Sequence, residues 1–209
     1  MHTIEVTCTG NNGRSVMAQA IGNLTVKNFN LEGKLCFISS GTRADLKYDQ
    51  FLPYDKVESM LSRGSRHGLF SPIDVDKVRY ENDPDYMLVI QERFQEAIVI
   101  MRSLEAIYRD AALFNIGLRH DGKRTQTIAR DDVSVVLGMQ QKHVNQIIKI
   151  YSATRHRPLI TTVTEYAGVD GEILDAIGNT NPKVYFEIRD RLSEIMPLVV
   201  RRFQREKPI

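Results

Sequence analysis

The chain has 209 residues, of which 42% are hydrophobic, and its formal net charge is +2. These values predict one domain with a real hydrophobic core, or one domain carrying an insertion. The small net charge gives no reason to expect a nucleic-acid partner, and no apolar run reaches membrane-spanning length. Two cysteines are too few for a disulfide framework, so we expect a protein of the reducing cytoplasm.

The first predicted element is a short strand at 3–7, followed by a polar loop and a helix over 14–28. The loop reads Cys8-Thr9-Gly10-Asn11-Asn12-Gly13-Arg14-Ser15. Its glycines let the backbone approach a ligand closely, and successive N–H groups before a helix N-terminus bind anions. Arg14 adds a guanidinium that fits phosphate oxygens, and Ser15 can donate to the thiolate of Cys8, which the positive field favours. The stretch therefore predicts a phosphate-binding loop that contains a cysteine nucleophile.

This loop resembles that of the low-molecular-weight protein tyrosine phosphatases, which reads Cys-x-Gly-Asn-x-x-Arg-Ser-x-Met-Ala after the first strand. The matching residues are Cys8, Gly10, Asn11, Arg14, Ser15, Met17 and Ala18. The resemblance implies an α/β fold with a four-stranded parallel sheet in the order 2-1-3-4 and helices on both faces. It also implies that Cys8 and Arg14 are catalytic, that Thr9 to Ser15 bind phosphate, and that no metal or cofactor is needed.

A second strand is expected at 34–39, and Ser40-Gly41-Thr42 follows it. In the family a serine at this point braces the phosphate loop through the loop asparagine. The resemblance therefore implies that Asn11, Ser15 and Ser40 support the loop.

The sequence departs from the family pattern on both sides of the loop. Many relatives have a protective cysteine where Gly13 stands, so we expect no disulfide there. An aromatic residue forms one wall of the family's substrate cleft, whereas the matching position here is about Leu46. Aromatic residues do lie nearby, at Tyr48, Phe51 and Tyr54. The departure leaves a preference for aryl phosphates open.

A helix is expected at 53–63, and beyond it the single domain, 1–209, carries a helical insertion at about 69–129. Asp83 as N-cap and Pro84 at the first helical position predict a helix that runs to about 116. Apolar residues recur along it every three or four positions, at Met87, Ile90, Phe94, Ala97, Met101, Leu104, Tyr108 and Ala111. A second apolar set is Val89, Val99, Ile100, Ile107, Leu113 and Phe114. We expect this helix to pair with its twofold mate in a homodimer; the alternative is a helix folded wholly onto its own domain.

The remaining predicted elements are a strand at 133–137, a helix at 140–151, a strand at 158–163 and a helix at 182–203. After a similar strand the family has a helix that carries Asn or His, which suggests His143 here. Residues 136–148 also resemble a helix-turn-helix, but the expected basic surface is missing. Pro197 should kink the last helix or begin its final turn.

Cleavage of a phosphate monoester needs a proton for the leaving oxygen. In the family an Asp on the loop before the last helix supplies it, usually as Asp-Pro. Asp175 has this place in the chain but is followed by Ala176, whereas Asp83 precedes Pro84 within the insertion. We assign the general acid to Asp175, because a helix cap is a sufficient explanation for Asp83.

These residues predict a phosphomonoester hydrolase that acts through a cysteinyl-phosphate intermediate on a phosphorylated protein or a small phosphomonoester. One alternative is an arsenate reductase, whose substrate is an inorganic oxyanion. Because Cys36 is the only other cysteine, such an enzyme would need an external thiol. The other alternative is a weakly active phosphate-binding scaffold that presents the inserted helix.

Overall fold

The computed structural model describes residues 1–44, 65, 70–78, 84–120, 124–176, 179 and 181–207. The chain forms two compact units, one of residues 1–45 with 105–209 and one of residues 46–104. The sheet and all the predicted catalytic residues belong to the first unit. The expected helix at 53–63, the cap residue Asp83 and the cleft segment around Leu46 lie outside the described residues.

The first unit contains a four-stranded sheet in the order β2-β1-β3-β4, and every pair of neighbouring strands is parallel. The strands are β1 (His2–Cys8), β2 (Leu35–Gly41), β3 (Val133–Gly138) and β4 (Leu159–Thr162). The predicted order, 2-1-3-4, is confirmed. Because β1 is a central strand, its carboxyl end lies where parallel α/β sheets bind ligands.

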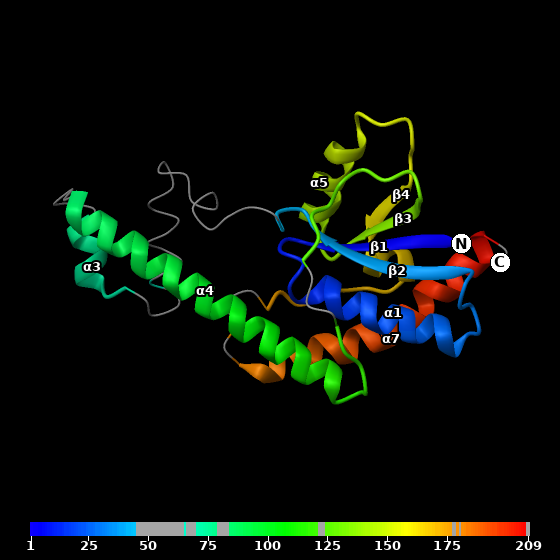
Figure 1. Ribbon diagram of the computed structural model, residues 1–209, viewed down its shortest axis with the longest axis horizontal. Coiled ribbons are helices and arrows are strands. Elements are labelled where there is room, and N and C mark those ends of the chain that lie inside the picture. Colours follow the sequence, from blue (N-terminus) through cyan, green and yellow to red (C-terminus); the bar gives the residue numbers. More distant parts are fainter. Residues whose placement is uncertain are drawn as a thin grey trace. The chain divides into compact units, whose positions relative to one another are not determined.

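Helices cover both faces of this sheet, as predicted (Figure 1). The helices α1 (Arg14–Asn28) and α7 (Pro182–Glu206) lie together on one face, and α5 (Gln141–Tyr151) packs against β3 and β4 on the other. A bulge in β3 skips Ser134 in its pairing with β1. Val133 therefore joins the core under α5, whereas Val135 joins the core under α1 and α7.

The central strand β1 has one apolar and one polar side, and both are buried. Ile4 and Val6 belong to the core beneath α1 and α7. Side chains alternate along a strand, so Thr3, Glu5 and Thr7 point to the opposite side, where each is at most 5% exposed. A buried carboxyl group therefore lies within the sheet, just below the loop that follows β1.

The long inserted helix is present as α4 (Pro84–Phe114), within the range predicted for it. Its last turns pack in the first unit, where Leu113 is fully buried in the main core. Tyr108 contacts Tyr185 of α7 with ring centroids 5.6 Å apart, and Arg189 donates to Asn115 Oδ1 at 2.8 Å. Beyond α4, Gln126 forms a bridge to Gly41 at the end of β2. In the part of the chain that is described, no helix is both long and apolar enough to cross a membrane.

The C-terminal half of the chain follows the predicted elements, with two differences. A short helix, α6 (Val163–Ala167), was not predicted, although Thr162 and Glu165 form a capping box at its start. The helix α7 continues through Pro197 to Glu206, beyond the predicted end. The helix-turn-helix alternative is wrong, because Val136 and Leu137 lie in the strand β3.

The second unit is described by itself through α3 (Pro72–Asp76) and the first part of α4. Ser71 caps α3, because its hydroxyl accepts from the backbone N–H of Asp74 at 3.1 Å. Val75 and Ile90 are buried. The division of the chain into one phosphatase-like domain with a helical insertion at 69–129 remains a proposal.

Candidate active site

The loop between β1 and α1 occupies the carboxyl end of the central strand. Gly13 is the N-cap of α1, it provides no side-chain cap, and the first turn of the helix contains no acidic residue. The positive end of this helix is therefore not neutralised from within its own first turn. Arg14, the first residue of α1, is buried, with 4% of its side chain exposed. This arrangement suits an anion placed over the loop.

Backbone hydrogen bonds fix the orientation of three carbonyl groups in the loop. The carbonyl of Cys8 accepts from the N–H of Thr42 at 2.9 Å, and the carbonyl of Thr9 accepts from the N–H of Arg43 at 2.9 Å. The carbonyl of Gly13 accepts from Met17 N–H at 3.0 Å, as the first bond of α1. In a trans peptide the N–H points away from the carbonyl. The N–H groups of the residues that follow these three carbonyls therefore point toward the opposite side of the loop.

The predicted nucleophile lies at the base of this loop and contacts Ser15. The Sγ of Cys8 is 3.1 Å from the Oγ of Ser15. The Ser15 hydroxyl also lies 3.0 Å from Asn11 Oδ1, and Asn11 has the left-handed backbone conformation that asparagine tolerates, with φ of 47°. Ser15 has one hydroxyl proton, so a thiolate at Cys8 would compete with Asn11 Oδ1 for it.

Ser40 lies next to the loop, and the backbone at the end of β2 contacts two loop side chains. The amide of Asn11 donates to the backbone carbonyl of Ser39 at 3.4 Å, and Ser15 Oγ lies 3.2 Å from the carbonyl of Ser40. The hydroxyl of Ser40 donates to the buried carboxyl group of Glu5. The end of β2 therefore braces the loop through its backbone. The expectation that Ser40 supports the loop stays a prediction; its backbone carbonyl accepts from Ser15, and its hydroxyl is bound on the polar side of β1.

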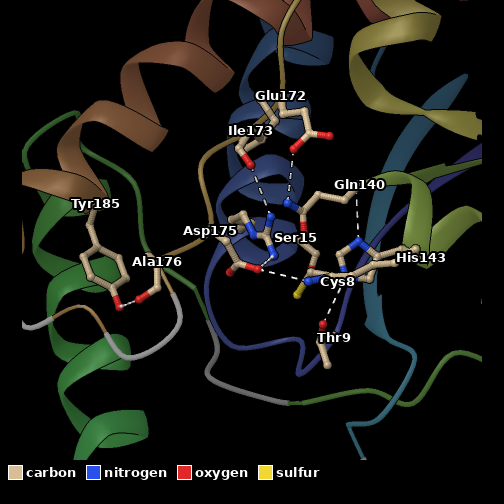
Figure 2. A network of polar contacts seen from close by, with 12 residues as sticks. Cys8, Thr9, Ser15, Gln140, His143, Glu172, Ile173, Asp175, Ala176 and Tyr185 are labelled. Atoms are coloured by element: carbon tan, nitrogen blue, oxygen red, sulfur yellow. Dashed lines mark hydrogen bonds and ion pairs between the residues drawn. The ribbon is translucent and has the colours of Figure 1, made fainter. Parts of the chain in front are cut away.

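Asp175 reaches the phosphate loop from the segment that precedes α7 (Figure 2). Its Oδ2 is 2.8 Å from Nη2 of Arg14 and 3.2 Å from Nζ of Lys142. Arg14 also donates from Nη1 to the carbonyl of Ile173 at 3.2 Å. Asp175 keeps 27% of its side chain exposed, whereas its partner Arg14 is buried. The predicted acid and the predicted phosphate-binding arginine are therefore in direct contact.

His143 of α5 is buried and holds the other end of the loop. Its Nδ1 accepts from the N–H of Gln140 at 3.1 Å, so Nε2 carries the proton of the neutral ring. That Nε2 is 3.0 Å from Thr9 Oγ1 and donates to it (Figure 2). Burial and then the charges of Arg14 and Lys142 lower the pKa of His143 to about 4. His143 is therefore neutral near pH 7, which leaves the hydroxyl proton of Thr9 available to another acceptor.

The last turns of α4 contact the loop at Asn12 and Gly13. Asn12 Nδ2 donates to Glu105 Oε2 at 2.9 Å. A Cβ atom added to Gly13 would lie only 2.5 Å from Glu105 Oε1. The carboxylate of Glu105 therefore lies directly against Gly13, and a larger residue at position 13 would require this side chain to move. Glu105 was missed in the sequence, because nothing local links a helix residue to a loop more than ninety positions earlier.

The second cysteine lies well away from the loop. In the register of β1 with β2, Thr3 is opposite Cys36 and Cys8 is opposite Gly41. Five residues of strand separate the two thiols, or about 16 Å at ~3.3 Å per residue. That exceeds the reach of a disulfide without backbone movement. Among the described residues, no group of three or more His, Cys, Asp or Glu side chains is placed to hold a metal ion.

Neither a protein-family model nor a curated protein sequence matches this chain, but solved structures do. YwlE arginine phosphatase from Geobacillus stearothermophilus aligns with a TM-score of 0.58 at 18% identity, over 100% of this chain and 96% of that one. A low-molecular-weight protein tyrosine phosphatase from T. tengcongensis aligns with a TM-score of 0.59 at 16% identity, over 96% and 99%.

A low-molecular-weight phosphotyrosine phosphatase from Vibrio cholerae O395 aligns over 99% of both chains, with a TM-score of 0.61 at 15% identity. This chain therefore has the fold of the low-molecular-weight protein tyrosine phosphatases. The resemblance inferred from the loop sequence is confirmed at the level of the fold.

Proposed function

We propose that this protein is a phosphatase that acts through a phosphocysteine intermediate. One observation carries the proposal. Asp175, which is distant in sequence, contacts the loop at the carboxyl end of β1 that contains both Cys8 and Arg14. Arg14 lies within 2.8 Å of Asp175, and Cys8 begins the same loop that Arg14 ends. A nucleophile, an oxyanion-binding group and a proton donor are the three groups that phosphoryl transfer needs.

In the first step the thiolate of Cys8 attacks phosphorus, an S–P bond forms, and the bond from phosphorus to the leaving atom breaks. Asp175 donates its proton to that leaving atom. In the second step water attacks phosphorus while Asp175 accepts the water proton, and the S–P bond breaks to regenerate the thiolate. Arg14 and the loop N–H groups stabilise the charge on the equatorial oxygens in both steps.

The contact between Arg14 and Asp175 gives a reason for Asp175 to be protonated when it is needed. Without phosphate, two cations lie on Asp175 Oδ2, and both favour the carboxylate. A phosphoryl group on Arg14 would compete with Asp175 for the guanidinium. The carboxyl group would then lie beside a negative group and keep Lys142 as its remaining cation, so the balance moves toward its protonated form.

The test is turnover of p-nitrophenyl phosphate by the wild type, Cys8→Ser and Cys36→Ser. Cys8→Ser should lose turnover while keeping phosphate binding, because only the thiolate is removed. Cys36→Ser is the matched control, since Cys36 lies at the far end of β2 and contacts Thr3 Oγ1 at 3.6 Å. Acid quench of the wild type during turnover should trap phosphate on Cys8. Wild-type turnover by Cys8→Ser would contradict the mechanism.

The bond that is cleaved is best identified with a panel of substrates. The structural neighbours include an arginine phosphatase and tyrosine phosphatases, so phosphoarginine and phosphotyrosine peptides belong in the panel. Arsenate with an external thiol tests the reductase alternative. Phosphate binding without turnover of any of these would support the scaffold alternative. Because the mechanism depends on a free thiol, we place the protein in the cytoplasm.

We also propose that the protein forms a homodimer through α4. Ile107 and Phe114, which belong to the second apolar set, lie seven residues apart on this helix and are 59% and 66% exposed, whereas Ile90 of the first set is buried. Two large apolar side chains at this spacing can meet a second copy of the helix. Light scattering at micromolar concentration should give a dimer, and Ile107→Glu with Phe114→Glu should give a monomer. A monodisperse wild-type monomer near 23.9 kDa would contradict the proposal.

A further inference from the structure

Two arginines outside the loop motif donate to the carbonyl groups of the phosphate loop. Arg124 donates from Nε to the carbonyl of Gly10 at 2.9 Å. Arg109, near the end of α4, donates from Nη1 to the carbonyl of Asn12 at 2.6 Å. Both arginines belong to the segment that links β2 to β3, and each binds a different peptide group of the loop.

Because the peptide group is planar, a bond that fixes a carbonyl also fixes the direction of the next residue's N–H. The described chain has no cis peptide bond, so each N–H points away from the carbonyl of the preceding residue. A carbonyl of Gly10 held by Arg124 aims the N–H of Asn11 to the opposite side of the loop. A carbonyl of Asn12 held by Arg109 does the same for the N–H of Gly13. These are two of the donors that an anion-binding loop provides.

Each arginine is anchored by a second contact, so neither can simply follow the loop if the loop moves. Arg124 donates from Nη2 to the carbonyl of Ala44 at 2.7 Å. Arg109 is buried, and its guanidinium is 2.8 Å from a carboxylate oxygen of Asp110. The planar guanidinium suits this task, because its several N–H groups can bind a loop carbonyl and a second partner at the same time.

We propose that Arg109 and Arg124 are positioning residues of the phosphate site, which aim the N–H groups of Gly13 and Asn11 at the phosphate. The proposal rests on the proposed function, in that the loop is the site where phosphate binds. Their role differs from that of Arg14, because they act on the loop carbonyls rather than on the ligand. Arg109 and Arg124 are therefore part of the site, although both lie outside the loop motif.

The test is titration of the ¹⁵N-labelled full chain with inorganic phosphate. In the wild type, the amide signals of Asn11 and Gly13 should both shift. Arg124→Gln should remove the shift at Asn11 and keep that at Gly13, and Arg109→Gln should do the reverse. Each variant should bind phosphate about tenfold more weakly, as expected for the loss of a charged hydrogen bond.

A control variant separates the effect of losing a positive charge from the effect of losing the orientation of the loop N–H groups. Arg43→Gln removes a positive charge from an exposed side chain, whereas its backbone N–H still donates to Thr9. Its loss of affinity measures the electrostatic part, and both amide shifts should persist. Arg109→Lys and Arg124→Lys keep the charge without the planar fork. Each Lys variant should weaken the shift of the same amide as its Gln counterpart and keep the other. The Lys variants replace the Gln variants if a Gln variant does not fold.

Uniform loss of both shifts in every variant, or unchanged affinity and shifts in both Gln variants, would overturn the positioning role. The proposed function fails by a different result, namely phosphate binding without turnover by the wild type. If the wild type turns over substrate but neither arginine substitution changes phosphate affinity or the amide shifts, the proposed function holds and the positioning role is wrong. A wild type that binds no phosphate would overturn both.

Discussion

The phosphate loop and the acid loop, which runs from 172 to 176, are held in different ways. Cys8, Thr9 and Gly13 of the phosphate loop have carbonyls bound to backbone N–H groups, and Asn11 and Ser15 are almost fully buried. In the acid loop Ile173 and Ala176 are buried, and Ala176 accepts from the N–H of Asn179 at 2.9 Å, but side chains bind its carbonyls as well. Arg14 binds the carbonyl of Ile173, Tyr185 donates to the carbonyl of Ala176 at 3.3 Å, and Leu174 is 56% exposed.

This difference matches the roles that the two loops have in the proposed mechanism. A nucleophile and its oxyanion donors work best when they are fixed before the reaction, because no reorganisation is then needed. A general acid must instead change its proton and its partner during each cycle. The acid loop is tied to the phosphate loop through Arg14, so phosphate binding and the state of Asp175 are coupled. The following variants break or sharpen this comparison.

The largest effect is expected from Arg14→Lys, because this side chain belongs to both loops. Lysine keeps the charge but loses the bidentate fork and the contact with Ile173. We expect kcat/KM for p-nitrophenyl phosphate to fall by about 10³-fold. Lys142→Gln is the control, since it removes the other cation on Asp175 and leaves the phosphate loop intact. Equal losses for the two variants would contradict the distinct role of Arg14.

Asp175→Asn should lower the rate for poor leaving groups such as phenyl phosphate by about 10²-fold or more. Good leaving groups need less proton assistance and should be affected less. The rates should be measured across a series of substituted aryl phosphates, with Asp170→Asn at an exposed position as the control. An equal loss across the series, or a larger effect from Asp83→Asn, would overturn the assignment.

His143→Gln tests how firmly the phosphate loop depends on a neutral histidine. Burial lowers the pKa of His143 from 6.5 to about 4, so the unfolded chain binds a proton first as the pH falls. The native state should lose about 3 kcal/mol of stability between pH 6.5 and pH 4 through this one group. His143→Gln should lack that loss, as measured by urea unfolding across this range. A parallel pH dependence in both proteins would contradict it.

Glu5→Gln tests the buried carboxyl group beneath the loop, for which the pH dependence has the opposite sign. Burial raises the pKa of Glu5 above 4.5, with the bond from Ser40 opposing it, and Oε2 has no hydrogen-bond partner among the residues that the structure describes. The wild type should therefore lose stability relative to Glu5→Gln as the pH rises above 4.5. The loss is about 1.4 kcal/mol for each unit by which the pKa is raised. Glu187→Gln, at an exposed position, should show no such trend.

The sequence by itself determined the phosphate loop and the order of the elements in the first unit. Cys8 to Ser15 form their site within eight residues, so their identity and spacing are sufficient to recognise it. The buried strands and the caps of α4 and α7 are likewise local signals, since Pro84 and Pro182 stand at helical N1 positions. Asp175 is preferred to Asp83 as the proposed general acid from its place before the last helix, and its carboxylate lies 2.8 Å from Arg14.

Only the tertiary structure decided which distant side chains meet the loop. Glu105, Arg109 and Arg124 come from the segment between β2 and β3, and their contacts depend on how that segment packs. The Ser40 side chain binds Glu5 rather than Asn11, because strand pairing places Ser40 above a buried carboxyl group. Residue type and spacing act over a few positions, whereas these contacts arise from the register of strands and the docking of helices. The sequence therefore specifies the chemistry of the loop, and the folded chain specifies how that loop is held.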